Sequence, residues 1–304
     1  MTNPFECAGV WLRCALHAHT TNSDGELPPP LLVEHYERAG FDVLAITDHS
    51  VRTIVASSAR LLVLPGSELG ARVGRRGRDA HVLALGIGAD PPPHGGDVGD
   101  LGEVAGWVTD VGGIPFLAHP YWSGLRADDF EGSGVAGLEV FNGASQLETG
   151  RGPGAVHWDD VLESGARLLG IATDDCHRPR YESSLAWVWA RARERSEADV
   201  LAAIRDGCFY SSTGPELSQL AVADDTVEVR TTPARRITLV AGRKRGASVS
   251  VGRPEYVHNG EVLARDGSGA ITAVRLYRPV SAPYGRLEIE DVHGRTAWTN
   301  AIWP

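Results

Sequence analysis

The stretch CALHAHTTNSDGELPPP, residues 14–30, decides the fold, because a short apolar run ends there in two histidines separated by one residue. Side chains two residues apart on a strand point to the same face, so His17 and His19 are placed to act together. Asp24 follows them in a turn of small and polar residues. A strand exit and a plain turn would explain each residue separately, whereas a metal site explains all three together.

The first two thirds of the chain alternate between short apolar runs and helical patterns. Nearly continuous apolar runs of this length suit strands that are buried on both faces of a parallel sheet. The helical patterns carry apolar residues at three- and four-residue spacing, and each ends near a glycine, which is a common helix stop. The alternation predicts an α/β fold of βα repeats. The predicted strands are residues 11–16, 42–46, 60–65, 81–87, 113–118, 137–141 and 167–172, and the predicted helices are 31–41, 98–113, 158–168 and 196–209.

The pattern changes at about residue 215. Residues 226–232, 236–242, 248–252, 271–277 and 286–298 alternate polar with apolar side chains, and Gly, Asp and Pro separate them. This alternation is typical of antiparallel strands with one solvated face. The sequence therefore predicts two domains, an α/β domain over residues 1–214 and a small antiparallel β-rich domain over residues 215–304.

Composition excludes several classes of function. The formal net charge of −10 argues against binding long nucleic acid through its phosphates. No apolar run approaches the ~20 residues that span a bilayer, so we expect no membrane association. The N-terminus lacks the pattern of a signal peptide. The four cysteines are far apart and form no C-x-x-C pair, which predicts free thiols and a cytoplasmic protein. Oligomeric state stays open.

Polar side chains gather at the ends of the predicted strands. The carboxyl ends of strands in a βα barrel converge on one rim, where active sites are built. Each residue alone has a structural explanation as a strand exit, turn or helix cap, but six strands that deliver His, Asp or Glu to one rim favour a metal centre. Histidines and carboxylates without cysteine suit Zn, Mn or Fe. The candidate ligands are His17, His19, Asp24, His49, Glu68, His81, His119, Asp175 and His177.

The order of these motifs resembles the PHP (polymerase and histidinol phosphatase) superfamily over roughly residues 12–180. The matching motifs are HAH with a following SDG, TDH, GSE, a further histidine, AHP and D-x-H. The chain end GRTAWTNAIWP, together with ATDDCH and YSSTGPE, resembles the carbaryl-hydrolase-like branch. The resemblance implies a distorted (β/α)7 barrel with two or three divalent metal ions (Mn, Fe or Zn).

The resemblance also implies how the ligands are shared. One ion would take His17, His19, Glu68 and Asp175, a second would take Glu68, His81 and His119, and a third would take Asp24, His49 and His177. Glu68 would then bridge two ions. His49 or His177 could relay a proton to the leaving group, so these two residues and Glu68 are the catalytic candidates.

The leading hypothesis is a metal-dependent phosphoesterase that hydrolyses a small phosphorylated substrate, such as a nucleotide, with a metal-activated water. Two alternatives stay open: a carbamate or carboxylic ester hydrolase on the same centre, and a catalytically idle metal-bound interaction module.

Candidate substrate contacts also follow the predicted strands. The arginines before His81 could clamp a phosphate, or form an exposed basic hairpin. The aromatic pair after His119 could form a wall for a ring-bearing substrate, or pack in the core. The candidates are Arg72, Arg75, Arg76, Arg78, Tyr121, Trp122, Asn142, Arg178 and Arg180.

Overall fold

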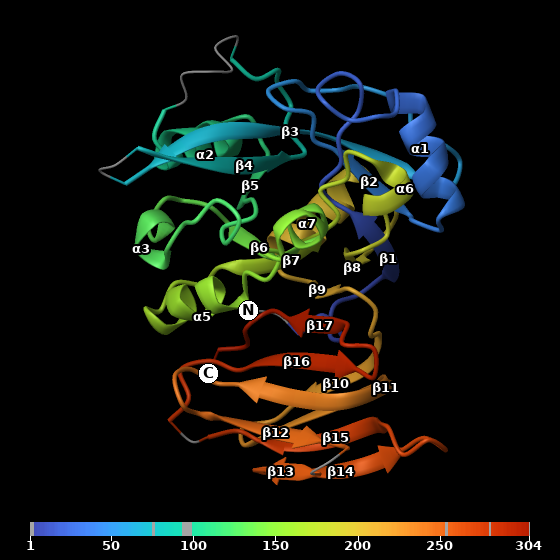
Figure 1. Cartoon of the computed structure of the whole chain (residues 1–304), viewed down its shortest axis with the longest axis vertical. Coiled ribbons are helices and arrows are strands. Elements are labelled where there is room, and N and C mark those ends of the chain that lie inside the picture. The colour runs from blue at the N-terminus through green and yellow to red at the C-terminus, as the bar shows by residue number, and fades with distance from the viewer. Residues whose placement is uncertain (1–2, 75–76, 93–98, 253–254, 280, 304) are drawn as a thin grey trace.

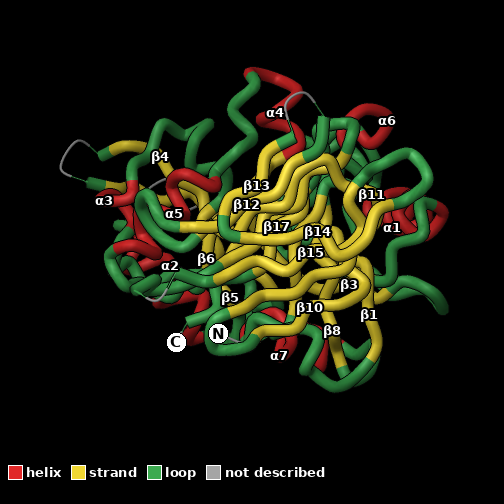
Figure 2. Tube along the Cα trace, turned by 90° about the horizontal axis from the view of Figure 1, so that it is seen from below, coloured by secondary structure: helices red, strands yellow, loops and turns green. Residues whose placement is uncertain are grey.

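The computed structural model describes residues 3–74, 77–92, 99–252, 255–279 and 281–303. Helices and strands alternate through the first two thirds of the chain, and antiparallel strands fill the opposite end of the long axis (Figure 1). Viewed along that axis, the helices lie at the periphery around the strands (Figure 2). The predicted mixed α/β fold is therefore confirmed.

Within the described ranges the helices are α1 (Pro29–Arg38), α2 (Leu101–Asp110), α3 (Ala127–Phe130), α4 (Gly143–Thr149), α5 (Ala155–Glu163), α6 (Pro179–Glu182) and α7 (Glu197–Arg205). The strands of the α/β part are β1 (Val10–Ala15), β2 (Val43–Ile46), β3 (Leu62–Val73), β4 (Arg78–Leu85), β5 (Ile114–Leu117), β6 (Gly137–Asn142), β7 (Leu169–Thr173), β8 (Trp187–Ala192) and β9 (Phe209–Ser212). The remaining strands are β10 (Leu217–Val222), β11 (Thr226–Val240), β12 (Gly246–Ser250), β13 (Tyr256–His258), β14 (Gly260–Arg265), β15 (Ile271–Tyr277), β16 (Arg286–Asp291) and β17 (Thr296–Thr299).

The α/β part combines parallel and antiparallel pairs. β8 runs antiparallel to β1 and to β9, and β4 interrupts the parallel order between two sets of strands. β1, β2 and β3 pair in parallel, as do β5, β6 and β7. β4 lies between the two sets and runs antiparallel to both β3 and β5. The expected βα alternation is thus wrong here, because Gly74 and Gly77, both at positive φ, close β3 and β4 into a hairpin. Since β4 is flanked on both sides, β3 and β5 still point the same way, and six strands deliver their carboxyl ends to one edge.

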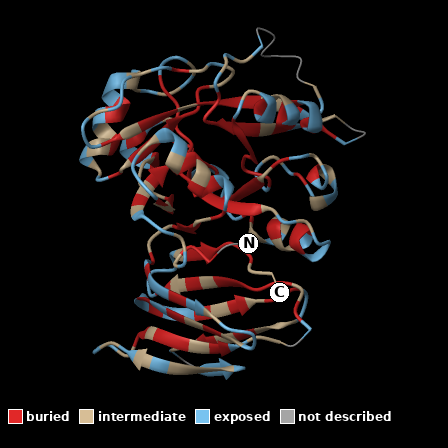
Figure 3. Cartoon of the chain, turned by 180° about the vertical axis from the view of Figure 1, so that it is seen from behind, coloured by how far each residue is buried: buried red, intermediate tan, exposed pale blue. Residues whose placement is uncertain are grey.

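The β-rich part is organised around the long strand β11. Its first half pairs with β10 and β15, and its second half pairs with β12 and β16. The register shifts around Pro233, which has no N–H to donate to a ladder, so the strand changes partners there. β17 pairs with β9, and Trp11 and Trp189 of the α/β part pack against the β-rich core. Burial is continuous from one part to the other (Figure 3).

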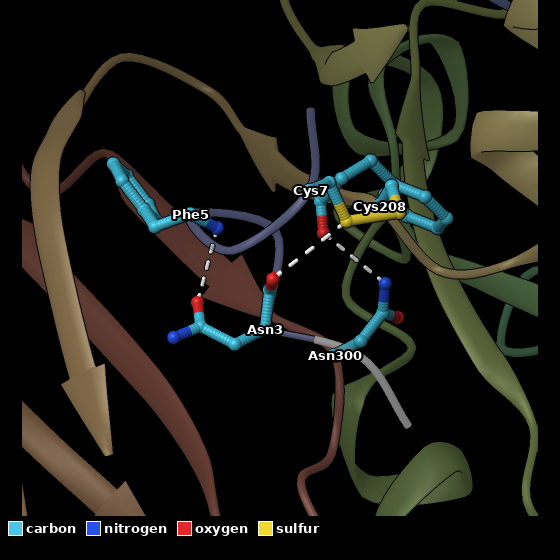
Figure 4. Close-up of a disulfide and its surroundings, with 6 residues drawn as sticks. Asn3, Phe5, Cys7, Cys208 and Asn300 are labelled. Atoms are coloured by element: carbon cyan, nitrogen blue, oxygen red, sulfur yellow. Dashed lines mark hydrogen bonds between the residues drawn. A yellow bond between two sulfur atoms is a disulfide. The ribbon is translucent and has the colours of Figure 1, made fainter. Parts of the chain in front are cut away.

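The cysteines correct one prediction. Cys7 and Cys208, 201 residues apart in sequence, form a disulfide with a Cα–Cα distance of 6.1 Å (Figure 4). Cys14 and Cys176 are buried free thiols, as predicted. The disulfide forms because the N-terminal segment folds back onto the start of β9, where Phe5 packs near Tyr210. Disulfides are typical of oxidising compartments, so this pair removes the cysteine-based argument for a cytoplasmic protein.

No helix in the described part of the chain is long and apolar enough to cross a membrane.

Candidate metal centre

The nine candidate ligands lie together at the shared edge of the parallel strands. Eight of them form three overlapping groups, within each of which the ligand atoms lie within 4.8 Å of one another. The groups are His17, His19, Glu68 and Asp175; His19, Asp24, His49 and His177; and His49, Glu68 and His81. The first two groups share His19, and the third shares Glu68 with the first and His49 with the second. The ninth candidate, His119, contacts Glu68 Oε1 through Nε2 at 3.0 Å.

The first group is the deepest. His17 and His19 are fully buried at the end of β1, and their Nε2 atoms lie 3.0 Å apart. His17 Nε2 lies 3.2 Å from Glu68 Oε2 and 3.1 Å from Asp175 Oδ1. Asp175 Oδ1 is buried and has no hydrogen-bond partner among the described residues. Four ligand atoms therefore converge on one point, and an ion there would satisfy the carboxylate oxygen.

The second group opens to solvent. Asp24, whose side chain is 55% exposed, lies 3.5 Å from both His49 Nε2 and His177 Nε2. The turn that carries Asp24 requires glycine at position 25, because a Cβ there would lie 2.3 Å from the carbonyl oxygen of His19. A ligand group that is partly open to solvent can leave coordination positions for water or substrate.

Glu68 lies between the groups and presents one oxygen to each side. Its Oε2 faces His17, His19 and His49, the last at 3.2 Å from Nδ1. Its Oε1 lies 2.8 Å from His81 Nδ1 and 3.0 Å from His119 Nε2. Glu68 occupies the middle of β3, which continues past the predicted strand end. His81 sits inside β4 and pairs with Gly70, two residues beyond Glu68 on the neighbouring strand.

Three histidines are oriented by hydrogen bonds from the ring nitrogen that faces away from the cluster. Nδ1 of His17 contacts Glu139 at 2.8 Å, Nδ1 of His119 contacts Ser123 Oγ at 2.9 Å, and Nδ1 of His177 contacts the Asp175 carbonyl at 3.1 Å. Each ring thus turns Nε2 toward the carboxylates. This arrangement is the usual one for histidines that bind metal, in which an outer partner fixes the tautomer.

The backbone at two ligands is unusual. His119 and Asp175 have φ values of 28° and 54°, a region that residues other than glycine rarely adopt. Such conformations persist where the surrounding structure holds them, and they concentrate at functional sites.

In the metal-free protein the cluster is a network of charge pairs. Burial opposes ionisation of Glu68, but His17 and its neighbours hold the pKa of Glu68 well below its usual range. Burial also lowers the pKa of His19, yet the adjacent carboxylates of Asp175 and Glu68 outweigh burial and raise that pKa to about 9. Burial lowers the pKa of His49. Protons therefore occupy the deep histidines where an ion would otherwise neutralise the carboxylates.

The predicted substrate contacts fall into different places. Asn142 is fully buried and its Nδ2 donates to Glu139 and Asp175, so it holds the cluster instead of touching substrate. Arg78 is engaged in an ion pair with Asp129 and in a bond to a backbone carbonyl, and it does not lie free as a clamp. Arg75 and Arg76 lie outside the described residues.

Other predicted contacts remain accessible. Tyr121 and Trp122 are about two fifths exposed, at 42% and 41%, and the Trp122 ring lies 5.0 Å from that of His119. Arg178 follows His177 and donates through Nε to Glu182, so its guanidinium is anchored at the surface. Arg72 is exposed on β3, and Arg180 lies over the Tyr181 ring.

Sequence reasoning missed the buried carboxylates behind the ligands. Asp48 accepts from the backbone N and Oγ1 of Thr20 at 2.6 and 2.7 Å, and from Ser23 Oγ at 2.8 Å, which fixes the turn that leads to Asp24. Glu139 lies in the middle of the apolar run GLEVF. A charged residue inside a run that reads as a fully buried strand is a signal that could have identified it.

No family model matches the sequence, and no curated protein matches it. Among solved structures, a two-domain protein from Bacteroides vulgatus that contains a predicted PHP-like metal-dependent phosphoesterase is similar over 99% of both chains, with 15% identity and a TM-score of 0.54. An amidohydrolase from Chromobacterium violaceum is 19% identical over 56% of this chain and 89% of its own, with a TM-score of 0.41. A proposed metal-dependent phosphoesterase from Bifidobacterium adolescentis is 18% identical over 55% and 88%, with a TM-score of 0.39. The first similarity shows that the chain has the two-part fold of that protein.

Proposed function

We propose that this chain is a metal-dependent phosphoesterase that hydrolyses a small phosphorylated substrate. The observation that carries the proposal is the set of three ligand groups joined by Glu68, His19 and His49. Histidine and carboxylate donors in overlapping groups suit two or three divalent ions of the Mn, Fe or Zn type. The fold shared with the two-domain protein from Bacteroides vulgatus supports the same reading.

We assign one set of residues to each ion. His17, His19, Glu68 and Asp175 would hold the deep ion, and Asp24, His49 and His177 would hold the open one. Glu68 Oε1 and His81 would hold an ion between them, with His119 Nε2 on the same oxygen at 3.0 Å. Bound ions would supply activation of water and stabilisation of the charge that builds on the substrate.

The chain's own groups would bind substrate and move protons around that centre. His49 is neutral at neutral pH, because burial lowers its pKa, and so it can accept a proton at whichever ring nitrogen binds no ion. His177 lies on the open side, where a leaving group would depart. Arg178 follows His177 and pairs with Glu182, and it would have to exchange that carboxylate for a phosphate oxygen to bind substrate.

A second function is favoured by a separate observation. The exposed Trp122 ring lies beside His119, and an aromatic surface there suits the aryl leaving group of a carbamate or carboxylic ester. The Tyr121 ring is also exposed but lies near His157. We keep this ester hydrolase as the alternative.

The test is a two-substrate rate comparison on metal-stripped, manganese-reconstituted protein. One arm measures phosphate release from nucleotide monoesters, including a 3',5'-bisphosphate, and the other measures naphthol release from a naphthyl carbamate. Glu68→Ala should abolish the activity, whereas Asp291→Asn, which removes a buried carboxylate of β16, should not. Naphthol release alone would replace the phosphoesterase with the ester hydrolase. Silence in both arms would favour the idle interaction module.

The aromatic surface has its own control. Trp122→Ala should slow the hydrolysis of aryl substrates, and Tyr256→Ala, which removes an exposed ring from β13 in the β-rich part, should leave it unchanged.

A further inference from the structure

Glu139 on β6 is a fully buried carboxylate that no candidate ligand group contains. Its Oε1 lies 2.8 Å from His17 Nδ1 and accepts from Thr173 Oγ1 at 2.5 Å. Its Oε2 accepts from the backbone N of His119 and from Asn142 Nδ2, both at 2.7 Å. An ionised carboxylate has about four acceptor sites. Three of them take the donors of Thr173, His119 and Asn142, and His17 Nδ1 faces the fourth.

These four contacts connect Glu139 to ligands from three strands. His17 follows β1, and His119 follows β5 in the unusual backbone conformation at φ 28°. Asn142 links Glu139 to a third ligand, because its Nδ2 also lies 3.1 Å from Oδ2 of Asp175, which follows β7. A single side chain between these strands therefore orients one ligand ring, holds the backbone of a second ligand and contacts the carboxylate of a third through an amide.

We propose that Glu139 is the positioning residue that keeps a proton on Nδ1 of His17 when an ion binds, so that Nε2 is the nitrogen that gives up its proton to the ion. Nε2 is the nitrogen that faces Glu68 and Asp175, at 3.2 and 3.1 Å. In the opposite tautomer, Nε2 would carry a proton and could not bind an ion. The proposal rests on the proposed metal centre, but it makes a separate claim about which nitrogen of His17 is available.

The variant Glu139→Gln tests the claim because an amide must replace one acceptor oxygen with a donor. On the Oε2 side the new NH2 would face the backbone N–H of His119, which cannot become an acceptor. On the Oε1 side both partners can adapt, since the Thr173 hydroxyl can turn and His17 Nδ1 can lose its proton. The amide should therefore point its NH2 at His17 and drive the ring into the tautomer protonated at Nε2.

Two readouts follow this change without measuring turnover. Zinc affinity, measured by competition with a chromophoric chelator, should fall about 10- to 100-fold in Glu139→Gln, the usual effect of losing a carboxylate behind a ligating histidine. The ring ¹⁵N shifts of His17 in the zinc-loaded wild-type protein should show Nδ1 protonated and Nε2 bound to metal. In the variant the metal-bound Nε2 signal of His17 should disappear.

Two matched variants separate positioning from general damage to the interior. Thr173→Val removes one donor to Glu139 Oε1 but keeps the carboxylate and its contact to His17, so zinc affinity and the tautomer should stay close to wild type. Asp291→Asn changes a buried carboxylate to an amide in the β-rich part and should also leave zinc affinity unchanged.

The outcomes distinguish this inference from the proposed function. If the wild-type protein binds no zinc at His17, the metal centre itself is wrong. If it binds zinc and Glu139→Gln binds equally well, Glu139 does not position His17. Should Glu139→Gln fail to fold, the ring ¹⁵N spectrum of the zinc-loaded wild-type protein still tests the proposal. Zinc on Nε2 of His17 with a proton on Nδ1 would support it, and zinc on Nδ1 would overturn it.

Discussion

Replacing Arg286 by methionine tests the contact that joins the two parts of the chain. Arg286 on β16 is 1% exposed, and its guanidinium donates to both carboxylate oxygens of Asp159 on α5, at 2.7 and 2.6 Å. Nη1 also donates to Glu288 at 2.8 Å, and the guanidinium lies 5.0 Å from the Trp158 ring. Removing one partner of a buried ion pair costs about 3–5 kcal/mol, because the other charge is left unpaired.

The structure places the expected cost near the lower end of that range. The side chains of Asp159 and Glu288 are 27% and 29% exposed, so water can partly replace the lost donor. We expect Arg286→Met to lower the free energy of unfolding by about 3 kcal/mol. The double variant with Asp159→Leu should be at least about 1 kcal/mol more stable than the single one, because it removes the unpaired charge as well.

Urea unfolding at a fixed metal concentration, followed by tryptophan fluorescence, measures both changes. Arg193→Met serves as the control, because Arg193 is 76% exposed and its ion pair with Asp199 should contribute less than about 1 kcal/mol. The reasoning is refuted if Arg286→Met is no more destabilising than this control, or if the double variant is less stable than the single one.

Three further predictions concern the disulfide and the metal centre. Cys7→Ser breaks a link to Cys208 that closes a very long loop, and it should lower the free energy of unfolding by about 2–5 kcal/mol; equal urea midpoints for variant and wild type would contradict this. Asp48→Asn loosens the turn before Asp24 and should weaken the most weakly bound ion about 10- to 100-fold in a calorimetric titration, with the tightest binding step unchanged. An unaltered weakest step would count against the assignment of Asp24 to the open ion. Because the pKa of His19 is about 9 without metal, ion binding at neutral pH must displace a proton, and the apparent affinity should rise as pH rises toward 9. Calorimetry in buffers of different ionisation enthalpy measures that release, and binding without it would show that His19 is not a ligand.

The sequence predicted what depends on local pattern. Apolar runs that end in His17, His119 or Asp175 indicated both the strands and the edge where these side chains meet, because parallel strands carry their carboxyl ends to one side. The change in alternation near residue 215 likewise indicated a β-rich region that follows the α/β part.

Features that depend on long-range packing were not predictable in the same way. The direction of β4 is set by the short connection at Gly74 and Gly77. The neighbouring arginines left both a phosphate clamp and an exposed basic hairpin open, and the sequence did not decide between them. The pairing of Cys7 with Cys208 follows from where the N-terminal segment lies on the folded surface, and no spacing encodes it. Asn142 lies at a strand end as the ligands do, but its side chain is buried and its Nδ2 donates to Glu139 and Asp175. The sequence pattern does not show that the folded chain brings these carboxylates to Asn142.

Anomalous diffraction from crystals loaded with manganese tests the central claim most directly. The account predicts one peak bound by His17 Nε2, His19 Nε2, Glu68 and Asp175, and at least one more within the groups that contain His49. The absence of any peak among these side chains at saturating manganese, or binding confined to other carboxylates, would contradict the metal centre and the function built on it.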